Sequence, residues 1–233
     1  WSVIWAMVDQ TLAGLGHAHA RGVIHGDLKP SNIMLDLASA GRGPRAYILD
    51  LGLAWLRESH HDKRLDGADV PELAVHSGAG TVGWVAPEQI RKAAAHVGPP
   101  TDLYALGVLM YETLTGGLPI RAQNRRDLLE LHQSRIPDPI AIRRPDLGIP
   151  AALDDAIMQC LEKNVAARPA SASALGEKLA AVFFTLMAPS SQGLMPPAKP
   201  ARFSLLDQGP QGEAVPDKFA NAPDKGCTAG HAE

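Results

Sequence analysis

The sequence predicts a mainly α-helical fold, a bundle around one central buried helix with a small β-hairpin beside it. A stretch that follows Pro99 is apolar on nearly every face, which is typical of a helix inside the core. Other segments repeat apolar residues at helical spacing, whereas strand-like runs are few and short. The 233 residues are enough for one domain and a tail.

The central helix is predicted from about residue 101 to residue 115. Thr101 or Asp102 can cap its N-terminus, just after a Pro-Pro pair. The helix is expected to stop at Gly116-Gly117. The first helix of the chain is expected to end near Arg21-Gly22, where Gly22 can take the left-handed conformation that terminates helices. Apolar spacing places that helix and three weaker ones at residues 4 to about 20, 125–133, 151–161 and 171–187.

Short apolar runs predict the strands. Residues 23–25 are expected to form a short buried strand that leads into a loop. Residues 33–35 and 47–49 flank a Gly- and Pro-containing turn at 41–44, which predicts a hairpin. Residues 54–83 show no periodicity, and a loop of that length in a compact domain is functional or disordered as a rule.

Composition limits the classes of partner. The net charge is −3 and the pI is about 6.3, so nothing favours nucleic acid. The chain has two cysteines, Cys160 and Cys227, and no disulfide framework. The lack of a disulfide framework suits a reducing compartment, so we expect a cytoplasmic location. No apolar run is long enough to span a bilayer, which leaves open a membrane anchor elsewhere in the protein. We expect a domain at residues 1–187 and a Pro/Gly-rich disordered tail or linker at 188–233.

Two polar clusters flank the predicted hairpin. One reads H-G-D-L-K-P-S-N from His25, and the other reads D-L-G from Asp50. Phosphoryl transfer needs a carboxylate to orient the attacking hydroxyl, cations on the phosphate, and metal ligands. Asp27 can supply the carboxylate and Lys29 the cation, while Asn32 and Asp50 can supply the hard oxygen ligands that Mg²⁺ prefers. The hairpin would bring the two clusters together.

These motifs resemble the catalytic loop H-R-D-L-K-x-x-N and the metal loop D-F-G of the protein kinase family. The resemblance implies that Asp27 is the catalytic base and that Lys29 contacts the γ-phosphate of ATP. It implies that Asn32 and Asp50 bind Mg²⁺, with Mn²⁺ as an alternative metal, and that Met34 lies beneath the adenine ring. The lysine within D-L-K-P-S-N is similar to the serine/threonine branch, whose substrates are proteins with Ser or Thr acceptors.

Further motifs extend the resemblance towards the C-terminus. G-T-V-G-W-V-A-P-E at 80–88 resembles the end of the activation segment, where Thr81 would touch both substrate and base. Asp102, within T-D-L-Y-A-L-G, would hold the backbone of the catalytic loop, and Arg168 would pair with Glu88. The other structural positions that the family pattern implies are His25 and Gly52. Each motif alone is common in turns and helix ends, so the prediction depends on their joint order.

Two positions depart from the family pattern. Gly26 replaces the usual arginine, which normally receives an activation-loop phosphate, so we expect less dependence on such phosphorylation. Leu51 replaces phenylalanine and keeps that position apolar.

The resemblance also leaves part of the family pattern unmatched. Ahead of the catalytic loop the chain has no glycine-rich loop, no strand lysine and no helix glutamate. We therefore expect a C-terminal lobe without its N-terminal lobe, inactive alone and α+β only when complete. The missing lobe would lie upstream of Trp1 in the parent protein, and an exposed apolar surface should mark where it docks.

Two other functions stay open. Aminoglycoside and choline kinases favour H-G-D over H-R-D, so Gly26 is compatible with a small-molecule phosphotransferase. Lys29, the A-P-E triplet and Arg168 argue against that class. A non-catalytic pseudokinase scaffold is the second alternative, and the intact acidic and amide residues of the two clusters argue against it.

Overall fold

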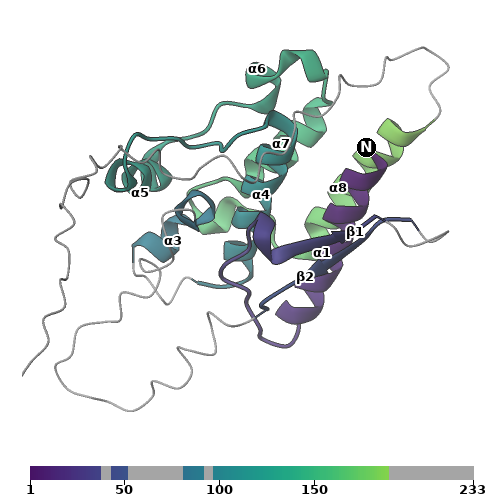
Figure 1. Cartoon of the computed structure of the whole chain (residues 1–233), viewed down its shortest axis with the longest axis horizontal. Coiled ribbons are helices and arrows are strands. Elements are labelled where there is room, and N and C mark those ends of the chain that lie inside the picture. The colour runs from purple at the N-terminus through teal and green to yellow at the C-terminus, as the bar shows by residue number, and fades with distance from the viewer. Residues whose placement is uncertain (38–42, 52–80, 92–96, 189–233) are drawn as a thin grey trace, which may run out of the picture. The chain divides into compact units, whose positions relative to one another are not determined.

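The computed structural model describes residues 1–37, 43–51, 81–91 and 97–188 (Figure 1). These residues form a helical bundle with a small antiparallel sheet, which confirms the predicted fold class. The predicted tail, apart from its first residue, and most of the long loop predicted at 54–83 lie outside the described residues. None of the helices in the described ranges is long and apolar enough to cross a membrane.

The central helix is α4 (Pro99–Thr115), and every residue from Thr101 to Tyr111 in it is buried. Gly116 ends it with φ of +74°, as predicted. The predicted cap at Thr101 or Asp102 is wrong, because the N-cap is Gly98. The two prolines lack an N–H and suit the first helical turn, so the helix begins earlier than expected.

The other helices surround α4. Figure 1 shows α1 and α8 side by side, and α7 packs against α4. The four predicted segments are confirmed as α1 (Ser2–His19), α5 (Arg125–Ser134), α7 (Ala151–Cys160) and α8 (Ala172–Met187). The single-turn helices α3 (Pro87–Ile90) and α6 (Ile140–Arg143) were not predicted, because one turn is too short to show a period. Short 3-10 turns complete the bundle: η1 (Pro30–Asn32), η2 (Thr81–Trp84), η4 (Pro145–Leu147) and η5 (Val165–Ala167).

The predicted hairpin is confirmed. Strand β1 (Ile33–Asp36) pairs antiparallel with β2 (Arg45–Ile48), and Ile33 lies opposite Ile48. The strand predicted at residues 23–25 is wrong, since that segment is in no sheet of the described part of the chain. Its backbone groups bind elsewhere: the Val23 N–H donates to the Ala18 carbonyl, and the His25 N–H donates to the side chain of Asp102 in α4.

Helix α1 fixes the hairpin in place. The Gln10 side chain accepts from the Ala46 N–H at 2.9 Å and donates to the Pro44 carbonyl at 3.0 Å. Gly14 allows close packing, because a Cβ there would lie 2.8 Å from Ile48 Cδ1. The hairpin therefore has a defined position on α1, and so does the segment that follows β2.

We predict opposite effects for two glycine-to-alanine substitutions in helices. A Cβ at Gly107 of α4 would lie 2.6 Å from the Cβ of Cys160, so Gly107→Ala should destabilise the fold by about 1–3 kcal/mol through overpacking. At Gly176 of α8 the nearest atom is 3.8 Å away, so Gly176→Ala should stabilise by about 0.5–1 kcal/mol. Urea unfolding followed by circular dichroism measures both. Equal effects would contradict this packing.

Candidate active site

The loop between α1 and β1 is held by one buried carboxylate. Asp102, 1% exposed in the first turn of α4, accepts the His25 N–H at 2.9 Å and the Gly26 N–H at 2.8 Å. The ring Nε2 of His19 at the end of α1 lies 2.8 Å from the same carboxylate. Loop, α1 and α4 therefore meet at this side chain.

His25 joins the two polar clusters. Its Nε2–H donates to the Leu49 carbonyl at 3.0 Å, and its Nδ1 accepts the Asp27 N–H at 3.3 Å. The Leu49 N–H donates in turn to the Asn32 carbonyl at 2.8 Å. Because Leu49 directly precedes Asp50, these contacts bring the loop and the end of β2 together at the open end of the hairpin, where β1 begins.

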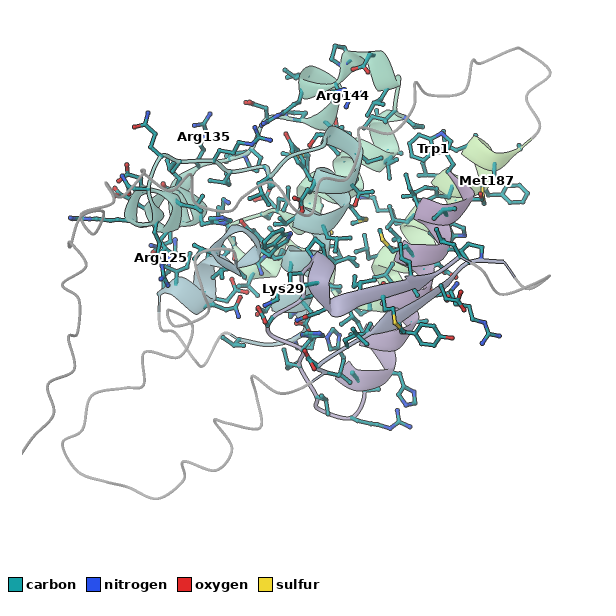
Figure 2. The ribbon with its side chains drawn as sticks, viewed as in Figure 1. Trp1, Lys29, Arg125, Arg135, Arg144 and Met187 are labelled. Carbon is teal, nitrogen blue, oxygen red and sulfur yellow. The ribbon has the colours of Figure 1, made fainter. Side chains whose placement is uncertain are left out.

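Asp27 and Lys29 form an ion pair in the loop that enters the hairpin at this end. Lys29 Nζ lies 2.6 Å from Asp27 Oδ2, and the Asp27 side chain is 37% exposed. Lys29, labelled in Figure 2, comes just before η1, the turn that leads into β1. At such a pair the solvent-accessible carboxylate can orient a hydroxyl, and the ammonium beside it can bind a phosphate.

Asn32 and Asp50 could hold a divalent cation. Asn32 is 6% exposed, and its Nδ2 donates to the Asp27 carbonyl at 2.8 Å, which directs its oxygen away from that bond. Asp50 is exposed and has φ of +55°, a conformation that aspartate tolerates and that recurs at functional sites. One carboxylate and one amide oxygen suit Mg²⁺, which takes few protein ligands besides waters and phosphates.

Of the other predicted site residues, Met34 is fully described, whereas Thr81 is described only in part and Gly52 not at all. Met34 lies on β1 and is 49% exposed. Thr81 begins η2, but its side chain and all of Gly52 lie outside what the structure describes.

The hairpin and the residues after it also carry an exposed apolar surface, formed by Met34, Leu35, Leu37, Tyr47, Leu49 and Leu51.

Glu88 and Arg168, which the resemblance pairs, form a buried bidentate ion pair. The two guanidinium nitrogens lie 2.7 and 2.8 Å from the two carboxylate oxygens. Thr101 Oγ1 donates to the same carboxylate at 2.8 Å, so Glu88 is also tied to the first turn of α4. Burial by itself would raise the pKa of the Glu88 carboxyl, but the hydrogen bond and charge of Arg168 outweigh it and hold that pKa below its usual value.

Arg168 also stacks on an aromatic ring. Its Cζ lies 4.8 Å from the ring centroid of Tyr104, whose hydroxyl meets Lys163 Nζ and His132 Nδ1, each at 3.1 Å. Burial lowers the pKa of His132 to about 4, so this histidine is neutral at pH 7, and burial lowers the pKa of Lys163 to about 8. These contacts fasten α5 and the chain after α7 to the central helix.

A glycine pattern lies just ahead of the A-P-E segment. The letters G-x-G-x-x-G occur from Gly78 to Gly83, but they indicate a nucleotide loop only between a strand and a helix. Here Thr81–Trp84 forms η2, and a Cβ at Gly83 would lie 2.6 Å from Leu118 Cδ1. Gly83 therefore serves close packing, while Gly78 and Gly80 lie outside the described residues.

Sequence reasoning missed two residues of the site. His19 completes the shell of Asp102, and Gln89 donates to the Gly26 carbonyl at 2.7 Å. A polar residue at the end of a helix or directly after A-P-E is a weak signal, because such positions are commonly exposed.

Comparison with known proteins identifies the class. A crystal structure of Rad53 1-466 in complex with AMP-PNP aligns with a TM-score of 0.55 and 22% identity, covering 76% of this chain and 39% of that one. This likeness shows the fold. The family model for the protein kinase domain matches residues 2–180. The chain belongs to the protein kinase family.

Its relatives are serine/threonine-protein kinases. The kinase pkn3 of Myxococcus xanthus is 36% identical over 178 residues, which are 76% of this chain and 30% of that protein. The kinase pkn2 of the same organism is 35% identical over 192 residues, 82% of this chain and 22% of the relative. The chain thus spans less than a third of the length of either relative.

We predict that the buried ion pair makes folding sensitive to acid. A carboxyl whose pKa is lowered by folding stabilises the protein above its unfolded pKa, near 4.5, and that stability is lost as pH falls through the folded pKa. Glu88→Gln should cost about 3–5 kcal/mol at pH 7, because it strands the Arg168 charge. The free energy of unfolding of the variant should also fall less steeply below about pH 4.5 than that of the wild type.

The matched control is Asp146→Asn. Asp146 forms a bidentate pair of similar length with Arg144, but on the surface, where ion pairs contribute little. Urea unfolding over a pH series should leave this variant close to the wild type. If both variants lose the same stability, burial is not what makes the Glu88 pair strong.

Proposed function

We propose that this chain carries the catalytic residues of a serine/threonine protein kinase, which transfers the γ-phosphate of ATP to Ser or Thr hydroxyls of proteins. The observation that carries the proposal is the Asp27–Lys29 pair at 2.6 Å, partly exposed on a loop that Asp102 holds in place. The names of the relatives and the AMP-PNP bound in the similar Rad53 structure support the same substrate classes.

Each residue of the pair has a defined part in the transfer. Asp27 would accept a hydrogen bond from the substrate hydroxyl and point its oxygen at the phosphorus. Lys29, in contact with Asp27, would lie close to the attacked phosphate and stabilise the charge on its oxygens. Asn32 and Asp50 would hold Mg²⁺, with Mn²⁺ as an alternative, and the metal would neutralise phosphate charge.

The domain organisation belongs to the same proposal. Residues 1–187 would form the C-terminal lobe, and 188–233 a tail or linker. The ATP-clamping lobe of the family would come from another part of the same polypeptide, and the C-terminal lobe would be inactive without it. The exposed apolar surface on and around the hairpin is a suitable docking surface for that lobe. We propose a cytoplasmic location for the domain.

The small-molecule phosphotransferase is less well supported. Gly26 is the feature that favours it, whereas the Glu88–Arg168 pair shows that the segment ending in A-P-E is built into the fold. A scaffold without activity would have no need of a partly exposed carboxylate in contact with Lys29.

The direct test is transfer of labelled γ-phosphate from Mg-ATP to a generic protein substrate by the longest natural form of the polypeptide. Asp27→Ala should lower the rate by roughly 10²–10⁴-fold, the contribution typical of a general base. It should leave the melting temperature nearly unchanged, because the side chain is partly solvated. Asp155→Ala, an exposed aspartate on α7, is the control and should keep full activity.

Label on Ser or Thr that disappears in Asp27→Ala supports the proposal. Label on choline or an aminoglycoside, with none on protein, would replace it with the small-molecule kinase. A folded complete protein that labels neither would leave the scaffold.

We also expect activity that depends little on phosphorylation of the activation segment, because Gly26 has no side chain to receive a phosphate. Treatment of the purified kinase with a phosphatase, followed by removal of the phosphatase, should leave the rate of substrate phosphorylation nearly unchanged. Loss of most of that rate, restored by autophosphorylation, would contradict this expectation.

A further inference from the structure

Gln89 connects the end of the A-P-E segment to the catalytic loop. Its Nε2 donates to the Gly26 carbonyl at 2.7 Å, and its Oε1 accepts the Ala86 N–H at 2.9 Å. Both ends of the side-chain amide are therefore used, one within its own segment and one across to a loop 63 residues earlier in the chain.

The bond reaches the peptide unit that orients Asp27. The Gly26 carbonyl and the Asp27 N–H belong to one rigid peptide plane. Gln89 holds the carbonyl edge of this plane, and His25 Nδ1 receives the N–H edge at 3.3 Å. Gly26 has φ of +72°, a region in which glycine meets no steric barrier, so its own backbone does little to fix the plane.

The anchor of Gln89 is rigid. Its neighbour Glu88 is 4% exposed and is bound by Arg168 and Thr101. Gln89 itself sits in the single turn of α3 (Pro87–Ile90), whose start it closes through the Ala86 N–H. The side chain thus extends from a fixed point and needs little ordering to bind the loop.

We propose that Gln89 is a positioning residue that sets the orientation of Asp27 by holding the Gly26–Asp27 peptide plane. It couples the loop to the segment Thr81–Glu88, which would meet the protein substrate. This inference rests on the proposed kinase function. Gly26 offers no side chain for such a link, and Gln89 supplies it with a neutral amide that needs no phosphate.

The amide is the group that the geometry requires. The contact to Gly26 needs a donor and the contact to Ala86 needs an acceptor, and a glutamine supplies both. Gln89→Glu keeps shape and acceptor, but it loses the donor and places a carboxylate oxygen against the Gly26 carbonyl. Gln89→Met keeps the length and removes both hydrogen bonds.

The test compares Gln89→Glu and Gln89→Met with Gln123→Glu, which makes the same charge change at an exposed position before α5. In the complete natural kinase, kcat of both Gln89 variants should fall roughly 10- to 100-fold, the size expected when a catalytic group is misplaced by about 1 Å. KM for ATP should stay unchanged, because the two Gln89 hydrogen bonds go to Gly26 and Ala86, neither of which is assigned to the nucleotide. Gln123→Glu should match the wild type.

Hydrogen–deuterium exchange gives a readout that does not depend on activity. Peptides covering residues 24–32 should exchange faster in both Gln89 variants, while those covering α7 and α8 should not. An unchanged kcat with unchanged exchange in this peptide would overturn the inference. So would global unfolding of both variants, since it would make Gln89 a residue of stability alone. If the wild type lacks kinase activity but the loop still loosens, the proposed function fails and the loop anchor stands.

Discussion

The buried carboxylate of Asp102 is the constraint on which the other contacts depend. A carboxylate with 1% exposure is costly unless hydrogen bonds replace its lost water. It receives two backbone N–H groups and the His19 ring, and it lies in the first turn of a helix, where the dipole favours negative charge. Because α4 is buried along most of its length, the loop with Asp27 is tied to a helix in the core of the fold.

The same helical turn also holds the segment that ends at Glu88. Thr101, next to Asp102, donates to Glu88, and Arg168, 80 residues beyond Glu88 in the chain, forms the ion pair with that carboxylate. Two adjacent residues therefore fix two loops that are far apart in sequence. Gln89 links those loops directly, so neither can shift without breaking a bond to the other. This arrangement explains how a chain whose catalytic groups lie in loops can keep them in a defined geometry.

The sequence predicted what depends on long patterns or on motif order. The five long helices, the hairpin and the family followed from periodicity, turn residues and the spacing of H-G-D, D-L-G, A-P-E and R-P. It failed where a tertiary contact decides the local structure. Residues 23–25 look like a strand, but the His25 N–H binds Asp102 instead of a neighbouring strand. Gln89 and His19 could not be predicted, because their importance lies in partners 63 and 83 residues away.

The claim that Asp102 holds the catalytic loop is tested most directly by amide exchange in Asp102→Asn, compared with the exposed α7 variant Asp155→Asn. The asparagine keeps the size of the side chain but turns an NH₂ group towards one of the two loop amides. We predict faster exchange at His25 and Gly26, because one buried amide loses its acceptor and the other exchanges a charged acceptor for a neutral one. The free energy of unfolding should fall by about 1–3 kcal/mol. Protection of both amides and an unchanged stability would show that the loop is held by something other than Asp102.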